Sequence, residues 1–218
     1  MAVGSKRGSS GVKLFWHVLV GVALLAVLSA CVTPAGYGYL AQEKVYRLAP
    51  QLGALQRRSL AHLFIPVAQV SPAIDSQRIV LFKPAYQQDF LANGRWPDRL
   101  STYFTSTVID ALSRSNAFLT VSDRPTSNQG GYKLLLRLTG FHAEYLPKSQ
   151  AKVAVVAQME ALLIREKNQR ILGQYRYDIR KDNINAHPDS IVVALNQALA
   201  DNLTSLANDM GKDLPVLF

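Results

Sequence analysis

The only cysteine of the chain, Cys31, ends an apolar stretch near the amino terminus, and this limits which residues can belong to a folded domain. Residues 1–13 are polar and cationic, residues 14–28 are almost entirely apolar, and two small residues follow. A basic start, an apolar centre and a small-residue end are typical of a secretory signal. The apolar run has about 15 residues, fewer than the roughly 20 that a helix needs to cross a bilayer. We therefore predict a leader over residues 1–30 that is removed on export, rather than a retained membrane anchor.

The residues at the end of this leader, Leu28-Ser29-Ala30-Cys31, resemble the lipobox of bacterial lipoproteins. The resemblance implies cleavage between Ala30 and Cys31, a diacylglycerol on the Cys31 sulfur and an acyl chain on the new amino group. One acyl chain binds a membrane only marginally, whereas three hold a protein there stably. Val32 follows the cysteine, and not the Asp that retains lipoproteins in the inner membrane of enteric-type bacteria. The resemblance therefore implies the outer membrane, with the protein facing the periplasm.

The remaining chain is long enough for one domain with a hydrophobic core, and a second domain is not expected. Residues 32–42 contain two glycines and a proline without apolar periodicity. We therefore predict a flexible tether over residues 31–42 and a single domain over 43–218. With no second cysteine in the chain, packing alone has to stabilise this domain.

The charge of the mature chain is basic but not extreme. Three of the 24 lysines and arginines precede Cys31, and none of the 15 acids does, so 21 bases stand against 15 acids after cleavage. Scattered, solvated bases explain this surplus, and we expect no nucleic-acid partner.

The order of the predicted elements indicates an α/β fold. A helix is expected after Pro97, with apolar residues from Leu100 to Leu112 at helical spacing, and a second from about Pro188 to Met210, stopped by Gly211. The short links between the last three strands favour antiparallel hairpins. We predict a single domain in which two long helices pack on one mixed, largely antiparallel sheet. The strands are expected at 44–48, 60–69, 78–83, 117–122, 132–145, 151–165 and 170–180.

The domain carries no motif of catalysis or of metal binding. His62, His142 and His187 do not lie three or four residues from one another or from a cysteine. No strained turn around a serine and no P-loop is present. Gly36-Tyr37-Gly38-Tyr39 neither follows a predicted strand nor opens a helix, so we interpret it as tether and not as a phosphate loop. We predict no enzyme, no metal site and no cofactor beyond the lipid on Cys31.

Two aromatic segments allow a functional and a structural interpretation. Tyr175-Arg176-Tyr177, with Arg180 and Lys181, interleaves rings and bases as a nucleic-acid platform does, but in a strand Tyr175 and Tyr177 share one face and the bases Arg176 and Arg180 share the other. We favour a half-buried sheet.

The second aromatic segment, Arg95-Trp96-Pro97, places a large ring at the entrance of the first predicted helix. There it can fix the loop to the core, which is the interpretation that we favour. Tryptophan and arginine are also common among interface anchors, so partner docking by Arg95 and Trp96 is the alternative.

Several of these segments together resemble the ABC-type transport auxiliary lipoproteins, also called PqiC-like or YmbA-like lipoproteins. The likeness covers nearly the whole mature chain, and its most specific element is a tryptophan just before the first helix. The segment between Leu48 and Leu60, which includes Arg57-Arg58, is longer here than is common in the family. The segments that carry the likeness are the lipobox, Val45-Tyr46-Arg47-Leu48, Arg78-Ile79-Val80 through Gly94-Arg95-Trp96 to Leu100, Ala111-Leu112-Ser113, Phe118-Leu119-Thr120-Val121 and the final long helix.

The resemblance implies a non-enzymatic component that works beside an Mce-domain protein and an ABC transporter, with its permease and ATPase, to move phospholipids between membranes. It would act by docking and positioning, and self-association into a homo-oligomer is compatible with that role. The alternatives are a lipid-binding or envelope-scaffold lipoprotein of TolB-like type without a transporter, and, third, a lipoprotein hydrolase.

Overall fold

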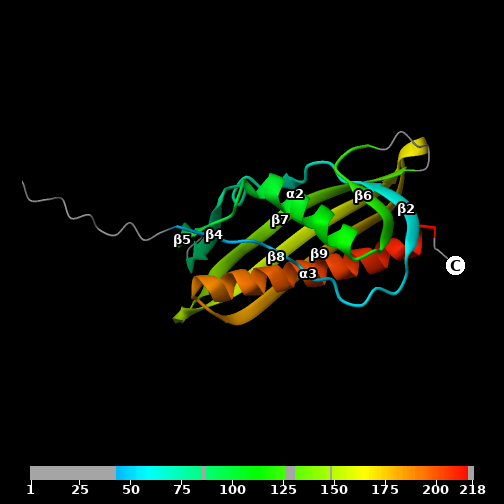
Figure 1. The fold of residues 1–218 in the computed structure, drawn as a ribbon. Helices are drawn as coiled ribbons and strands as arrows, with labels where there is room; N and C mark the ends of the chain where they lie inside the picture. The colour runs from blue at the N-terminus through cyan, green and yellow to red at the C-terminus, as the bar shows by residue number, and fades with distance from the viewer. Residues whose placement is uncertain (1–42, 85–86, 126–130, 148, 216–218) are drawn as a thin grey trace, which may run out of the picture. The chain divides into compact units, whose positions relative to one another are not determined.

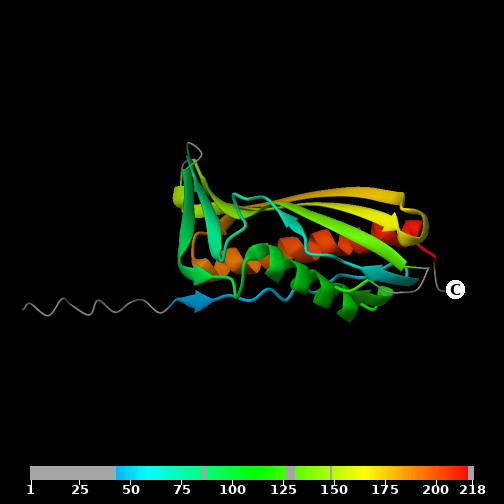
Figure 2. The same cartoon turned by 90° about the horizontal axis from the view of Figure 1, so that it is seen from above.

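The computed structural model shows one nine-stranded sheet with two long helices, α2 (Leu100–Arg114) and α3 (Pro188–Asp213). Both helices lie on the same face of the sheet (Figures 1 and 2). The predicted fold class, a single α/β domain with a mixed, largely antiparallel sheet, is confirmed. The structure describes residues 43–84, 87–125, 131–147 and 149–215.

The centre of the sheet is a long antiparallel meander, as the short links between its strands predict. It consists of β7 (Gly131–Leu146), β8 (Ser149–Arg165) and β9 (Arg170–Asn185). β8 pairs with β7 on one side, where Tyr132 lies opposite Arg165, and with β9 on the other side, where Lys152 lies opposite Asn185. β9 continues five residues beyond the expected end at 180.

A bulge in β7 changes which side chains face the helices. Up to Leu138 the even-numbered residues are buried, but after the register shift between Leu138 and Gly140 the buried positions include Phe141 and Ala143. A bulge inserts one extra residue and so exchanges the two faces of a strand. His142 consequently lies on the face away from the helices, together with Glu144.

The other edge of β7 pairs with three short strands in succession, all of them parallel to it. These are β2 (Ser59–Phe64), β3 (Gln69–Val70) and β4 (Arg78–Lys83). The single strand expected at 60–69 is therefore two strands, because the chain leaves the sheet at Pro66, which has no backbone N–H to donate to a ladder.

The remaining strands extend the sheet beyond β4 and β2. β5 (Gln87–Arg95) forms an antiparallel hairpin with β4, and the two-residue β1 (Lys44–Val45) pairs with β5. β6 (Phe118–Ser122) pairs in parallel with β2. β5 has polar residues with little alternation and is not among the predicted strands, and β1 ends at Val45, before the predicted end at residue 48.

Helix α3 begins as expected and ends later than expected. Pro188 occupies its first turn, and the His187 Nδ1 atom accepts a hydrogen bond from the backbone N–H of Asp189. Gly211 does not stop the helix, which continues to Asp213. Gly211 is buried, and a Cβ atom there would lie 3.5 Å from the Cβ of Arg57, so its small size suits a close approach of the chain.

An extended segment, residues 46–57, runs between the two helices; we call it the strap (Figure 1, blue to cyan). The N–H of its first residue, Tyr46, still donates to the Arg95 carbonyl oxygen of β5 at 2.8 Å, and the rest of the segment continues outside the strands. Side chains of α3 hold its backbone along most of its length. Three backbone N–H groups of the strap donate to these side chains: Ala49 to Asn196 Oδ1 at 2.8 Å, Gly53 to Thr204 Oγ1 at 2.9 Å and Gln56 to Asn208 Oδ1 at 2.9 Å. The Tyr103 hydroxyl of α2 accepts from the N–H of Leu48.

The spacing of these bonds shows that the strap runs in the same direction as α3. From Ala49 to Gln56 an extended chain advances about 23 Å, at roughly 3.3 Å per residue. From Asn196 to Asn208 a helix advances about 18 Å, at 1.5 Å per residue. These lengths of strap and helix are similar. Polar side chains on α3 can therefore reach the strap backbone at both ends of this stretch and between them.

Removing two of the α3 side chains tests how much they stabilise the fold. We expect the double substitution Asn196→Ala and Asn208→Ala to lower the free energy of unfolding by about 1–3 kcal/mol, because two backbone donors lose their acceptors. Urea denaturation measures this. Gln197→Ala is the matched control, since Gln197 bonds only to Asp201 on the exposed surface of the same helix. Equal losses in both variants would show that the strap is not held in this way.

Candidate docking surface

One face of the sheet is covered by the helices and the other is open, and β9 shows the difference residue by residue. Tyr175, Tyr177 and Ile179 are half-buried against α3, whereas Arg176 and Arg180 are exposed on the opposite side. Side chains alternate between the two faces of a strand. The interpretation of this segment as a half-buried sheet is confirmed.

Two tyrosines of β9 bond to α3 on the helix side of the sheet. The Tyr177 hydroxyl donates to Asp209 at 2.8 Å and the Tyr175 hydroxyl donates to Asp213. Burial, followed by these bonds to carboxylates, raises the pKa of both tyrosines. Lys181 adds an ion pair with Asp201 at 2.8 Å. Three contacts thus tie β9 to α3 and leave the opposite side of the strand for other partners.

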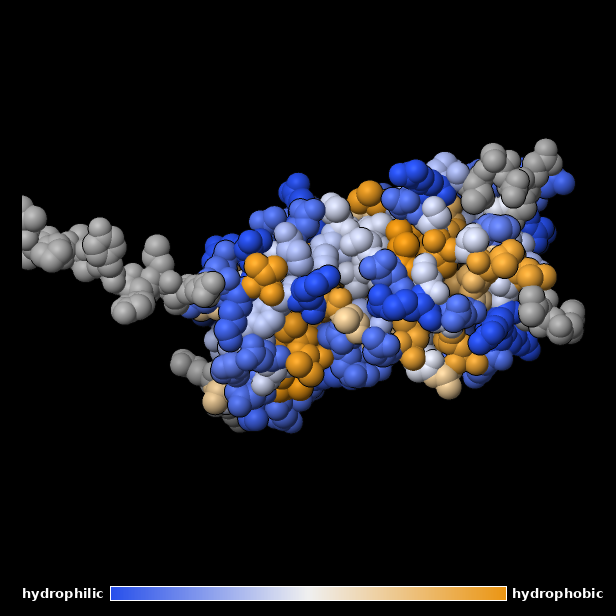
Figure 3. All heavy atoms as spheres, viewed as in Figure 1, coloured by the Kyte–Doolittle hydropathy of each residue, from blue (hydrophilic) through white to orange (hydrophobic). Residues whose placement is uncertain are grey.

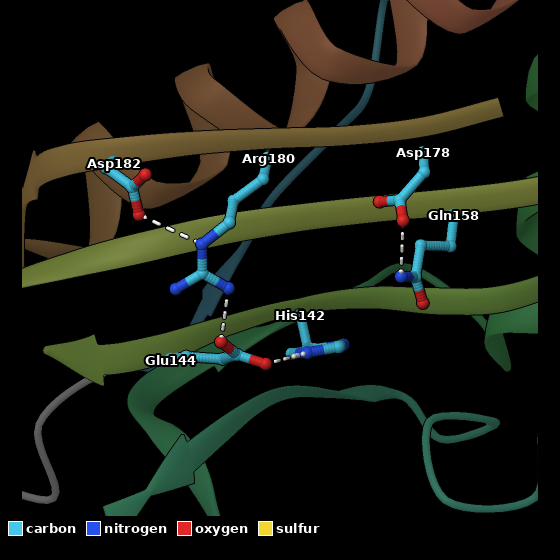
Figure 4. Close-up of polar contacts among 6 residues, drawn as sticks. All are labelled: His142, Glu144, Gln158, Asp178, Arg180 and Asp182. Atoms are coloured by element: carbon cyan, nitrogen blue, oxygen red, sulfur yellow. Dashed lines mark hydrogen bonds and ion pairs between the residues drawn. The ribbon is translucent and has the colours of Figure 1, made fainter.

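The open face carries a connected polar network across β7 and β9 (Figure 4). Arg180 Nη1 donates to Glu144 Oε2 at 2.6 Å, and Arg180 Nε donates to Asp182 Oδ1 at 3.0 Å. The second oxygen of Glu144 lies 3.0 Å from His142 Nε2. Burial alone would raise the pKa of Glu144, but the hydrogen bonds from Arg180 and His142 outweigh it and lower that pKa. Glu144 is therefore held as a carboxylate.

His142 is the most buried member of this network. It is 7% exposed, and the ring of Phe82 meets it edge-on with 4.7 Å between the ring centroids. Its Nδ1 atom has no hydrogen-bond partner within the described part of the chain. Burial lowers the pKa of His142 in spite of the neighbouring Glu144 carboxylate, so the fold favours the neutral imidazole.

Further along the open face the polar pairs continue. Gln158 Nε2 donates to Asp178 Oδ2 at 3.0 Å, a contact also drawn in Figure 4. Glu160 of β8 lies between two arginines, 2.8 Å from Arg176 and 3.7 Å from Arg137. These ion pairs are solvent-exposed, so each contributes little to stability on its own. They fix a defined pattern of charge on the surface.

The far end of the open face is apolar. A groove of about 410 Å³ lies there between the chain at Pro66-Val67 and the strands β7 to β9, with Leu135 and Leu162 on its floor. Val67 is 67% exposed and Leu135 is 38% exposed. An exposed apolar surface beside polar residues is a common property of interaction sites. Figure 3 views the molecule from the opposite, helix side, where apolar side chains lie in separate patches among polar ones.

The two residues that the sequence suggested for docking, Arg95 and Trp96, differ in their exposure to solvent. Trp96 is 1% exposed, and its ring packs near Tyr103 at 6.1 Å and Phe141 at 5.9 Å between centroids. The alternative that Trp96 itself contacts a partner is therefore wrong, and its role is the favoured one of packing at the helix entrance. Arg95 is partly exposed and forms an ion pair with Glu43 at 3.0 Å.

The other sequence predictions lie partly outside the described residues. Cys31, Ala30 and the glycine-tyrosine segment are among these, so their predictions stay untested. Across the described ranges, no cluster of three or more potential metal ligands occurs. Among the helices that the structure describes, none has the length and apolar character to cross a bilayer.

Comparison with known proteins decides the family. A family model for the ABC-type transport auxiliary lipoprotein component matches residues 46–207, most of the described domain. The chain belongs to this family. The family match covers the strap, both helices except the end of α3, and the whole sheet from β2 to β9. No curated protein sequence matches the chain.

Solved structures share the fold of this auxiliary lipoprotein. Protein XCC0632 from Xanthomonas campestris is similar with a TM-score of 0.66 and 17% identity, over 78% of this chain and 96% of that one. An uncharacterised protein is similar with a TM-score of 0.59 and 18% identity, over 78% of this chain and 99% of that one. At these identities the likeness supports the fold alone.

The burial of His142 predicts how stability depends on pH. Because its pKa is lowered from 6.5 in the folded chain, its contribution to stability is present above pH 6.5 and is lost as the pH falls through the lowered value. We expect His142→Gln to reduce the drop in melting temperature between pH 7 and pH 5, measured by circular dichroism. His62→Gln is the control, since His62 is less buried and contacts only Thr120. An unchanged drop in His142→Gln would contradict the prediction.

Proposed function

We propose that this family member is a lipid-anchored periplasmic component of an ABC transport system that moves phospholipids between membranes. It docks an Mce-domain protein, which works with the transporter's permease and ATPase, and it positions this partner at the outer membrane. It acts by binding and not by catalysis. Self-association into a homo-oligomer is part of the same proposal.

The observation that carries the proposal is the open face of the sheet. A sheet normally buries an apolar face, and here the two helices cover only one side. The other side presents the apolar groove at Leu135 and Leu162 beside the fixed charges of Glu160 and Arg176. A surface of apolar side chains ringed by charge suits protein docking. The family assignment supports a transport complex as the source of the partner.

The anchoring part of the proposal rests on Cys31 and is tested there. We expect the full chain to incorporate labelled palmitate and to fractionate with the outer membrane. Cys31→Ala should abolish both labelling and cleavage of the leader. Ser29→Ala, a substitution beside the cleavage position, is the control that should retain them. Labelling that persists in Cys31→Ala would contradict the proposal.

The docking part is tested by recovery of the partner from detergent-solubilised membranes. The tagged full chain should recover an Mce-domain protein. Leu135→Asp and Leu162→Asp should reduce the recovery at least about fivefold, because each places a charge in the apolar groove. Val193→Asp is the matched control, since Val193 is an apolar residue that is 69% exposed on α3, on the other side of the sheet.

Different outcomes point to different conclusions. Equal recovery with the groove variants would move the docking surface elsewhere on the chain. Reproducible absence of an Mce-domain protein would argue against the transport role and would favour the scaffold lipoprotein without a transporter.

A further inference from the structure

Strand β9 is the outermost strand of the meander, and its free edge is long. Over the part of the chain that the structure describes, β9 pairs with β8 alone. Its 16 residues contain no proline. An unpaired edge presents backbone N–H and C=O groups that can form hydrogen bonds with another strand, and proteins usually protect such edges. A long free edge without proline therefore needs a partner or a reason to remain single.

The charges on β9 alternate in sign along the open face. Arg176, Asp178, Arg180 and Asp182 stand at every second position and so share one side of the strand. Figure 4 shows three of them projecting away from α3. Such a pattern is neutral overall and recognises a strand with the same pattern in the opposite direction.

We propose that two copies of this chain pair through β9, antiparallel, about a two-fold axis at Ile179. In this register Arg176 lies opposite the partner's Asp182, and Asp178 lies opposite the partner's Arg180. The two-fold axis repeats each contact, so four cross-strand pairs of opposite charge form. Opposite charges directly across a ladder stabilise it and like charges destabilise it.

The charge pattern selects this register over its neighbours. In an antiparallel pair, all opposite residues have the same sum of residue numbers. A change of register must change this sum by an even number, since otherwise residues with side chains on different faces, and backbone groups that point in different directions, would lie opposite each other. The next register in one direction places Arg176 opposite the partner's Arg180 and Asp178 opposite its own copy. The next register in the other direction places Asp178 opposite the partner's Asp182 and Arg180 opposite its own copy. In both registers three of the four charged residues oppose a like charge, and the fourth opposes an uncharged residue.

The contacts within one chain leave these side chains able to bind a second copy. The described hydrogen bonds use one oxygen of Asp178, Oδ2, and one oxygen of Asp182, Oδ1. Arg176 contacts Glu160 through Nη2, and a guanidinium carries five N–H donors. The existing contacts direct Arg176 and Asp178 toward β8 and Arg180 toward β7, so pairing with a second copy requires these side chains to turn toward the free edge.

The helix layer fits the same arrangement. α3 lies over β8 and β9 (Figure 2). Strands in a sheet are about 4.8 Å apart, so continuing the sheet through β9 would place the two α3 helices about 10 Å apart. That is near the upper end of the usual 8–10 Å range for packed helices. The two copies would thus form a continuous sheet covered by a continuous helix layer.

A bulge marks where the pairing would end. Asn183 has a φ of 61°, and the β8 register shifts between Val153 and Val155, opposite this position. A bulge bends a strand and interrupts its ladder. The regular ladder therefore ends at Lys181, and Asp182 lies at the start of the bulge. The two inner pairs, between Asp178 and Arg180, lie within the regular part of the edge, and the two outer pairs lie at its end.

Charge reversal tests the register. The unsubstituted full chain, purified in detergent, should sediment as a dimer. Asp178→Arg and Arg180→Asp should each raise the dissociation constant at least about tenfold, because each turns two opposite-charge pairs into like-charge pairs. The double variant should restore dimerisation, since the two charges are exchanged across the axis. A monomeric unsubstituted chain, or dimers that ignore the single variants, would overturn the proposal.

A cysteine at the axis gives an independent measurement. Ile179→Cys should form a disulfide-linked dimer under mild oxidation, because residues directly opposite have Cβ atoms about 4.5–5.5 Å apart. Ile171→Cys is the control: Ile171 is 58% exposed on the same strand but lies far from its own copy in this register. The unsubstituted chain reports any linkage through Cys31. Equal linkage at 171 and 179 would overturn the proposed axis. The pairing deepens the self-association part of the proposed function. Neither experiment uses the transport partner, so a negative result here would remove that part alone and leave the anchoring and docking parts to their own tests.

Discussion

The pairing of β7 on both of its edges is the constraint on which the rest of the structure depends. One edge joins β8 along nearly its full length, and the other receives β2, β3 and β4 in succession. Segments from both halves of the chain therefore meet on a single strand. Because the helices pack on the sheet that this strand organises, the position of every surface described above follows from the register of β7.

The sequence predicted those elements whose apolar residues recur with a clear helical or strand period. It did not predict the elements that form only through contacts with other parts of the chain. The meander and both helices have strong apolar periodicity, and they appear near their expected positions. β5 is polar and becomes a strand because β4 offers it a partner, with Arg78 stacked 3.7 Å from the ring of Phe90. The strap has extended residues but no strand partner, since α3 supplies its hydrogen bonds through side chains. Such choices depend on tertiary contacts.

The candidate docking surface was predictable only in part, for a similar reason. Alternation in β9 correctly placed Tyr175 and Arg176 on opposite faces. The same rule applied to β7 would have placed His142 with the helices. The signal of the bulge in the sequence is Gly140, since a glycine inside a strand pattern often marks a bulge, but this signal does not by itself fix the register. The network of Glu144 and Arg180 joins strands that lie far apart in the chain, so only the registers bring the two residues together. Trp96 was correctly expected at the entrance of α2, and its burial explains why a residue type common at interfaces here serves the core.

The strap has a mechanical consequence. It begins directly after β1, close to the point where the domain receives any tension transmitted by the preceding chain. Its bonds to Asn196, Thr204 and Asn208 are spread along the direction of the strap. A pull along that direction loads them in shear, so they share the force and do not open one at a time like a zipper. A domain built in this way can bear strain at its amino terminus while the sheet on the other side keeps its shape.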